Sequence, residues 1–178
     1  GYALIGVAAV AAAPAEIKAD CISSVLIYLA IYLSMTVGSF ACVLAMRRGS
    51  LMSEAIQDLA GISKEQPLYA FLFAMLLFSL AGIPPLAGFF AKFYVFNAAI
   101  QAHLYWLAVI GVVLSVIGAY YYLRIVKIMY FDEPGVTFEP IPSAVQFTLA
   151  VAAGFTILFF LYPSPLKAAA DAASRSLF

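Results

Sequence analysis

The chain has 178 residues, of which 66% are hydrophobic and 10% are charged. This composition, with a mean hydropathy of +1.05, excludes an ordinary water-soluble domain. The nine basic and nine acidic residues cancel and are scattered along the chain, which excludes a basic surface for nucleic acid.

Long stretches without any charged residue dominate the sequence. They are residues 21–46, 66–91, 93–123 and 140–166. Each exceeds the roughly 20 residues that carry a helix across a bilayer. The stretches are apolar on every face and lack the alternation of barrel strands. The sequence therefore predicts an all-α, polytopic transmembrane helical bundle.

The predicted elements follow one another as about six spans of a single membrane domain, residues 1–178. We place the spans at residues 1–13, 22–46, 68–82, 86–102, 104–130 and 143–162. The first span is interpreted as truncated, because the chain starts in an apolar stretch with neither an initial Met nor the pattern of a signal peptide. We therefore expect the chain to be a fragment of a longer protein.

Polar segments mark the ends of the spans. Pro14 ends the first span, and the charged segment 16–20 is expected at a polar surface. The arginines of 47–48 form a basic interfacial stop. In the loop that follows, residues 53–59 are expected to form a short helix capped by Ser53.

An amphipathic surface helix is predicted at residues 165–177, after the last span. Lys167, Asp171 and Arg175 lie four residues apart on its polar face. Such a spacing stabilises a helix by only about 0.2–0.5 kcal/mol per pair. We interpret this face as solvated.

Two consecutive prolines, Pro84 and Pro85, interrupt the apolar stretch that begins near Pro67. Proline has no backbone N–H, so the helical hydrogen-bond ladder must fail there. Carbonyl groups are then left free, as in the discontinuous helices of transporters. A simple loop between two spans explains the same residues equally well.

Lys92 is an ionisable residue inside the span that follows the double proline, about two helical turns beyond it. A lysine at mid-bilayer costs about 2.5–3.5 kcal/mol on insertion scales, so it normally faces the protein interior or water. Desolvation disfavours its charged form, and a nearby charge then decides whether it holds a proton. We predict a proton relay at Lys92; the alternative is a lysine that snorkels to an interface.

His103, the single histidine, lies eleven residues after Lys92. If the helix continues that far, both side chains face one side, and His103 is a candidate for the proton path. The interpretation that we favour is an interfacial histidine beside Tyr105 and Trp106.

The sequence contains no Walker loop, dinucleotide fingerprint or metal-ligand cluster, so we expect this chain to bind neither a cofactor nor a metal. Cys21 and Cys42 lack a CxxC or His-rich context and are interpreted as small apolar fillers. Several polar residues within the spans could line water, although such residues more often bond neighbouring helices or their own backbone. They are Ser79, Thr36, Ser115 and Tyr120 to Tyr122.

Three runs of the sequence carry a resemblance. They are DLAGI at 58–62, FSLAGIPPLAGFFAKFYVF at 78–96, which contains the double proline and Lys92, and GAYYYLR at 118–124. These runs resemble the subunit N family (mitochondrial subunit 2) of proton-translocating NADH:quinone oxidoreductase, respiratory complex I. The resemblance covers nearly the whole chain.

The resemblance implies the second half of an antiporter-like inverted-repeat fold with one discontinuous helix. It implies that Lys92 is the protonatable lysine of the second half-channel, whereas the glutamate and lysine of the first repeat lie outside this chain. It also implies a C-terminus on the periplasmic or intermembrane side. The bias of the basic residues favours the opposite orientation.

The same resemblance implies an enzyme subunit without a redox centre of its own. NADH, FMN, Fe–S clusters and quinone are expected in other subunits. The expected partners are the other membrane-arm subunits, including neighbouring antiporter-like subunits, together with the lipid bilayer and protons. The expected location is the bacterial plasma (inner) membrane or the mitochondrial inner membrane.

Two alternatives remain open from the sequence. The chain could belong to a multisubunit cation/proton antiporter or a membrane-bound hydrogenase, whose related members share the discontinuous helix and its lysine. It could also be a scaffold of the membrane arm that moves no protons, in which an apolar residue could replace Lys92.

Overall fold

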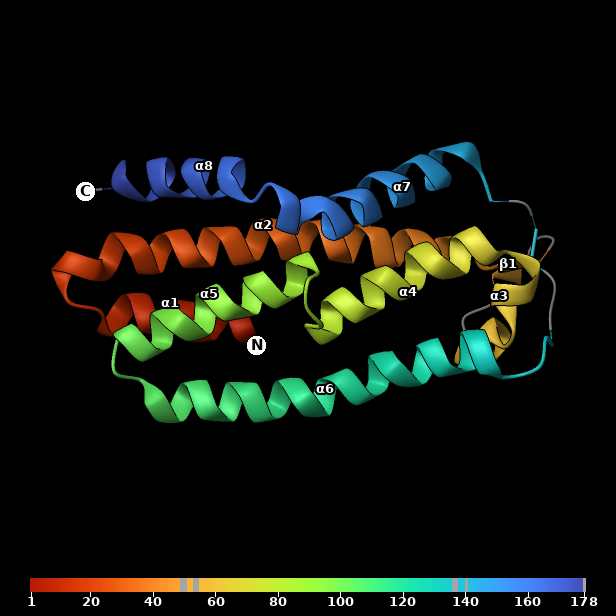
Figure 1. The fold of residues 1–178 in the computed structure, drawn as a ribbon, viewed down its shortest axis with the longest axis horizontal. Coiled ribbons are helices and arrows are strands. Elements are labelled where there is room, and N and C mark those ends of the chain that lie inside the picture. Colours follow the sequence, from red (N-terminus) through yellow and green to blue (C-terminus); the bar gives the residue numbers. More distant parts are fainter. Residues whose placement is uncertain (49–50, 53–54, 136–137, 140, 178) are drawn as a thin grey trace.

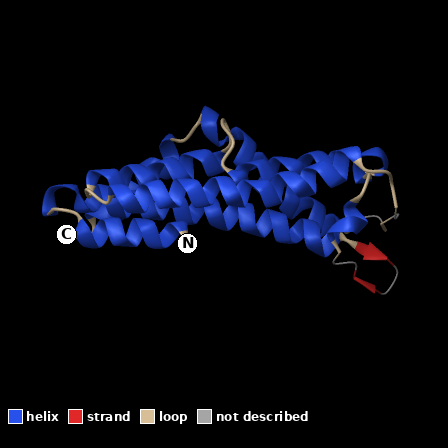
Figure 2. Ribbon diagram, turned by 90° about the horizontal axis from the view of Figure 1, so that it is seen from below, coloured by secondary structure: helices blue, strands red, loops and turns tan. Residues whose placement is uncertain are grey.

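The computed structural model describes residues 1–48, 51–52, 55–135, 138–139 and 141–177. Its helices are α1 (Tyr2–Ala12), α2 (Ala15–Ala45), η1 (Ile56–Leu59), α3 (Ile62–Glu65), α4 (Pro67–Ala81), α5 (Ala87–Gln101), α6 (Tyr105–Phe131), α7 (Ser143–Leu158), η2 (Phe159–Leu161) and α8 (Ser164–Arg175). A small antiparallel pair, β1 (Arg47–Arg48) and β2 (Leu51–Met52), lies at one end of the bundle (Figure 2). The predicted all-α bundle is confirmed.

The helices lie side by side along one long axis (Figure 1). α2 and α6 run along most of the bundle, whereas α4 and α5 follow each other end to end, as do α7 and α8. α2 is the central element and packs against α1, α4, α5, α7 and α8. With 31 residues it is about 46 Å long, which exceeds the roughly 30 Å of a bilayer's hydrocarbon.

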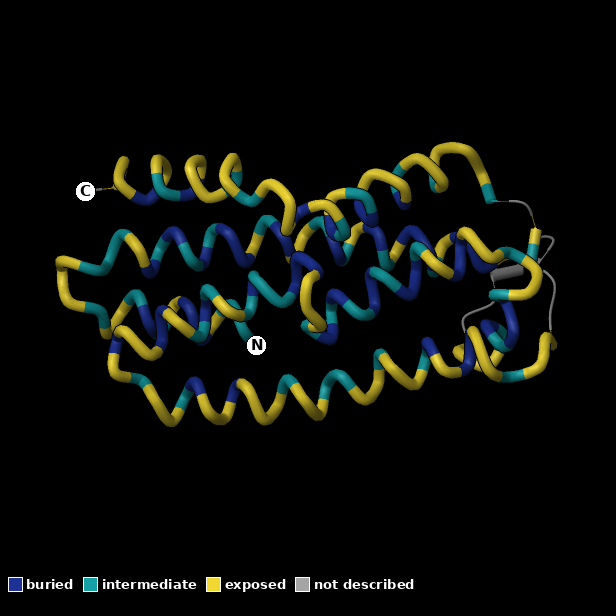
Figure 3. Tube along the Cα trace, in the orientation of Figure 1, coloured by how far each residue is buried: buried dark blue, intermediate teal, exposed yellow. Residues whose placement is uncertain are grey.

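Within the described residues, three helical segments are long and apolar enough to cross a membrane by themselves. They are Ala15–Ala45, Tyr105–Phe131 and Ser143–Leu161. In the most apolar 18-residue stretch of α6, only 11% is buried, and most of the helix is exposed (Figure 3). An apolar helix exposed in this way is stable against lipid or further protein and unstable against water. The chain is an integral membrane protein.

The helix that contains the second predicted span begins earlier than that span. α2 begins at Ala15, directly after Pro14, so the charged segment 16–20 belongs to the helix and not to a polar connection before it. Pro14 is the N-cap, and no further breaker follows it. Glu16 lies in the first turn, where the helix dipole favours a negative charge.

The loop after α2 is only partly described. Ser53, the predicted helix cap, lies outside the described residues. The described part of the predicted helix is the single 3₁₀ turn η1 at Ile56–Leu59, with Leu59 buried.

α4 and α5 are separated at the predicted break. α4 ends at Ala81, and Gly82 has a φ of 92°, in the left-handed region that glycine favours. The amide of Ile83 donates to the Phe78 carbonyl at 3.0 Å, and that of Gly82 donates to the Ser79 carbonyl at 2.9 Å. This pair of bonds is a Schellman cap. α5 then resumes in the same general direction (Figure 1), so the predicted discontinuous helix is confirmed.

Two hydrophobic clusters lie on either side of the break. The first gathers α1, α5 and the N-terminal half of α2 around Ile27, Ile31 and Val95. The second gathers α4, the C-terminal half of α2 and parts of α6 and α7 around Leu76 and Met129. The break therefore lies where one packed core ends and the next begins.

The predicted C-terminal amphipathic helix corresponds to α8. It lies lengthwise along the N-terminal half of α2 (Figure 1), with Ala170 and Ser174 buried. Its axis thus follows the bundle, and its polar face borders α2 and α5.

Candidate functional site

The side chain of Lys92 points from α5 back to the end of α4. Its Nζ atom donates hydrogen bonds to the carbonyl oxygens of Leu80 and Ala81, at 3.0 and 2.8 Å, and to the hydroxyl of Ser115 on α6, at 2.8 Å. An ammonium group has three N–H donors, and all three are used. The break lies near the middle of the bundle's length (Figure 1), so Lys92 does not reach toward either end.

The two carbonyls that Lys92 binds are those that the helix cap leaves over. The last four carbonyls of any helix lack partners within the helix. Here the cap uses those of Phe78 and Ser79. The following Pro84 and Pro85 have no N–H to offer Leu80 and Ala81. Lys92 supplies the donors that the double proline removes.

The charge of Lys92 faces dipoles and an aromatic ring. The carbonyl end of α4 carries a partial negative charge. The ring of Tyr2 on α1 lies 5.1 Å from Nζ, within the range of a cation–π interaction. Among the described residues, no carboxylate pairs with Lys92. Its hydrogen-bond partners are neutral groups.

Ser79 and Gly88 join α4 to α5 beside Lys92. The Gly88 amide donates to the Ser79 hydroxyl at 2.8 Å, and that hydroxyl donates to the sulfur of Met35 on α2 at 2.9 Å. A Cβ atom at Gly88 would collide with the Ser79 carbonyl group. This position therefore needs a glycine for close approach, and the contact fixes how α5 starts beside α4.

A cavity of about 400 Å³ opens beside Lys92 between α5 and α6. Its polar lining comes from Lys92, Asn97 and Ser115, and its remaining wall is apolar. By volume the cavity has room for several water molecules, because one occupies about 30 Å³ in the liquid, but only these three polar residues offer them hydrogen bonds.

A second, strongly polar crevice of about 350 Å³ lies between α2, α5 and α8. It is lined by Asp20, Ser23, Ser24, Ile27, Tyr94, Asn97, Gln101, Lys167, Asp171 and Arg175. Asn97 lines both this crevice and the cavity beside Lys92.

Comparisons with known proteins identify a family for this chain. A family model described as NADH:quinone oxidoreductase/Mrp antiporter, TM matches residues 1–118. The chain belongs to this antiporter family. The match includes the break, Lys92 and Ser115.

Curated relatives match the whole chain. NADH-quinone oxidoreductase subunit N of Methylobacterium nodulans is 56% identical over 100% of this chain and 36% of its own length. The subunit N of Azorhizobium caulinodans is 59% identical over 100% of this chain and 36% of its own length. The chain thus spans about a third of the length of these relatives.

A solved structure shares the fold. One chain of respiratory complex I from Thermus thermophilus with bound aureothin superimposes with a TM-score of 0.73 at 26% identity. The superposition covers 93% of this chain and 42% of that chain.

In the present structure, His103 lies away from Lys92. α5 ends at Gln101, and His103 occupies the turn to α6 with a φ of 59°. Its Nδ1 atom lies 2.9 Å from the Tyr105 hydroxyl, and its side chain is exposed. The helical continuation that would align it with Lys92 is therefore absent.

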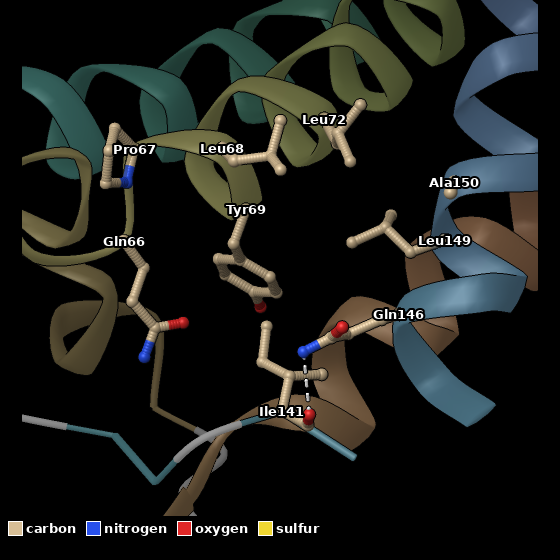
Figure 4. A pocket seen from close by; sticks show the side chains of 9 residues that line it. All are labelled: Gln66, Pro67, Leu68, Tyr69, Leu72, Ile141, Gln146, Leu149 and Ala150. Carbon is tan, nitrogen blue, oxygen red and sulfur yellow. Dashed lines mark hydrogen bonds between the residues drawn. The ribbon is translucent and has the colours of Figure 1, made fainter. Parts of the chain in front are cut away.

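An apolar pocket of about 560 Å³ lies elsewhere, between α4 and α7 (Figure 4). Two polar groups of its lining have partners: Tyr69 donates to the Cys42 carbonyl at 2.8 Å, and Gln146 donates to the Ile141 carbonyl at 2.9 Å. The amide of Gln66 also lines the pocket, and the remaining wall is apolar. Such a lining suits an acyl chain better than a charged ligand.

Sequence reasoning placed Lys92 and named Ser79 and Ser115 only as polar groups within spans. It missed the ring of Tyr2, the close approach at Gly88, and Asn97. Gly88, the second residue of α5, was a signal for close packing. Nothing in the sequence pairs Tyr2 with Lys92, ninety positions later.

Proposed function

We propose that this chain is the C-terminal part of subunit N of a proton-translocating NADH:quinone oxidoreductase. In this proposal Lys92 is the central proton relay of the half-channel in the second, antiporter-like repeat. The redox chemistry, with NADH, FMN, Fe–S clusters and quinone, belongs to other subunits. The named relatives and the solved complex I chain support this assignment.

The observation that carries the proposal is the set of groups around Lys92. A lysine held by a carboxylate would be locked in its charged form, whereas two carbonyls, a hydroxyl and a ring stabilise the charge less strongly. The charged and neutral forms are then close enough in free energy for a nearby charge to change which one is populated.

Ser115 suits both forms of the lysine. A charged ammonium donates three hydrogen bonds, but a neutral amine has two N–H groups and one lone pair. The two carbonyls can only accept, so they keep the two remaining N–H groups. The hydroxyl of Ser115 can rotate and donate to the lone pair. Loss of the proton thus leaves no buried polar group without a partner.

The proposed setting follows from the same relatives. Because these relatives are bacterial, we place the protein in the bacterial plasma membrane. Its exposed apolar helix α6 faces lipid, the rest of subunit N or a neighbouring membrane-arm subunit. A cation/proton antiporter subunit remains the second candidate, since the matching family includes Mrp antiporters. Copurification with the NADH-oxidising arm distinguishes the two.

The decisive experiment compares two substitutions of Lys92 in the full-length subunit, assembled in its complex in membrane vesicles. Lys92→Ala removes the proton carrier. Lys92→Arg keeps a positive donor that does not release its proton near neutral pH. We expect both variants to oxidise NADH but to translocate fewer protons per electron. Native electrophoresis checks assembly.

Lys127→Ala is the matched control, because Lys127 is an exposed lysine paired with Asp132 at 3.3 Å near the end of α6. It should translocate protons normally. If Lys92→Arg pumps normally, a fixed positive charge suffices and the relay is wrong; if Lys92→Ala also does so, the segment is a scaffold.

A further inference from the structure

The relay at Lys92 needs a route to water. Lys92 lies nine residues before the end of α5, so about 13 Å of helix separate it from the end of the bundle. A hydrogen bond joins heavy atoms that are only about 2.8 Å apart, so a proton needs several intermediate groups or waters over that distance.

Asn97 lies between a mostly apolar cavity and a polar crevice in the α5 half. It lines the cavity beside Lys92 and also the polar crevice between α2, α5 and α8. It lies about 7.5 Å along the helix from Lys92, slightly more than half of the way to Gln101. Its amide has no hydrogen-bond partner among the described residues, so both its donor and its acceptor can hold water.

The crevice beyond Asn97 ends in ionisable groups. The buried hydroxyl of Ser23 on α2 donates to the carboxylate of Asp171 on α8 at 2.5 Å. Asp20, Lys167 and Arg175 line the same space. The charges of α8 therefore face a crevice that starts at the bundle end and continues inward to Asn97, and they do not simply point to solvent.

We infer that Asn97 and Asp171 form the proton route between Lys92 and the aqueous end of α8. This inference rests on the proposed function of Lys92. Asn97 is a positioning residue that holds water between the two spaces, and Asp171 is the carboxylate that exchanges a proton with bulk water.

The proton balance of this route is simple. The N–H bond of the Lys92 ammonium breaks as a water beside Asn97 accepts the proton. That water passes a proton along the crevice to the Asp171 carboxylate, which becomes a carboxylic acid. Asp171 then releases its proton to bulk water, with Ser23 as the hydrogen-bond donor to the restored carboxylate. Transfer in the other direction uses the same groups in reverse.

Three variants of the full-length subunit in the assembled complex test the route. Asn97→Leu fills the junction with an apolar side chain, and Asp171→Asn removes the carboxylate while keeping the fold of α8. Both should lower proton translocation per electron at least threefold, with assembly intact. Asn97→Ser leaves a small polar group with room for water and should retain most of the translocation.

Gln146→Leu is the matched control, because it also replaces an amide by an apolar residue but lies in the pocket between α4 and α7. Normal pumping in Asn97→Leu and Asp171→Asn, with pumping lost in Lys92→Ala, overturns the route and leaves the relay standing. Normal pumping in these two variants and in Lys92→Ala overturns both the route and the relay.

A labelling experiment separates a route from a structural role. Asn97→Cys is compared with Val109→Cys, which lies at a similar distance from the turn at 102–104 but on the exposed apolar surface of α6. A membrane-impermeant, charged methanethiosulfonate should modify the cysteine at 97 at least tenfold faster than that at 109. Equal rates, or no reaction at 97, exclude a water-filled crevice and overturn the inference even if a pumping variant fails to assemble.

Discussion

The two halves of the discontinuous helix have the same length and very different surfaces. α4 and α5 each contain 15 residues. α4 has no charged residue, and its buried polar side chains, Tyr69 and Ser79, are hydrogen bonded. α5 has a buried face of small residues on α1 and α2, and it presents Lys92, Asn97 and Gln101 to cavities.

The two helices therefore contribute different groups to the site: α4 contributes backbone, and α5 contributes side chains. α4 contributes only two backbone carbonyls, and it contributes them because the break leaves them free. Of these two helices, α5 contributes the ionisable and amide side chains near the site. In the proposed relay, Lys92 changes its protonation opposite a helix end whose last carbonyls have hydrogen-bond partners.

The largest expected effect comes from breaking the junction that holds the halves in place. Gly88→Ala puts a Cβ atom against the Ser79 carbonyl, which is backbone and cannot move aside cheaply. Overpacking of this kind costs about 1–3 kcal/mol or more. We expect a clear fall in the thermal midpoint of the assembled complex, measured by native electrophoresis after heating, and reduced assembly.

Gly154→Ala is the control for that variant. Both glycines lie in helices, so both substitutions gain about 1 kcal/mol of helix propensity. A Cβ atom at Gly154 meets nothing within 4 Å. Equal thermal midpoints for the two variants would show that α4 and α5 are not held at Gly88.

A smaller effect is expected from Ser79→Ala. It removes the acceptor for the buried Gly88 amide, and an unpartnered buried donor costs about 1–3 kcal/mol. Ser79→Cys keeps a polar group at the position and serves as the comparison. The same heating assay should rank wild type above Ser79→Cys and Ser79→Ala below both. A midpoint unchanged in Ser79→Ala means that another group satisfies Gly88.

The sequence was a good guide to the break and a poor guide to what surrounds it. Pro84, Pro85 and Gly82 act locally, since each limits its own backbone or removes its own donor, and their effect can be predicted from position alone. α2 begins at Ala15, before the predicted span at residues 22–46, and its first turns contain the charged segment 16–20. A helix that extends beyond the hydrocarbon accommodates such charges in its first turns.

The site divides in the same way. Lys92 could be identified from the sequence because it is an ionisable residue inside an apolar span. Its partners, however, come from three other helices. Ser115 lies 23 positions later, and the pair of Ser23 and Asp171 is separated by 148 positions. No periodicity links residues so far apart, because their distance is set by how helices pack. The crevice that Asn97 shares could therefore emerge only from the folded chain.

The smallest effect on stability, and the sharpest test of the α5 half, is expected from Ser115→Ala. Water in the adjoining cavity can replace the lost hydroxyl, so the loss of stability should be below about 2 kcal/mol. Proton transfer should suffer more, because a loosely held water must now alternate between accepting from the ammonium and donating to the amine. We expect slower proton translocation at an unchanged rate of assembly, with Ser115→Thr, which keeps the hydroxyl, close to wild type. If Ser115→Ala and Ser115→Thr translocate protons equally well, Ser115 only fills space beside Lys92, and the two carbonyls of α4 alone govern the lysine.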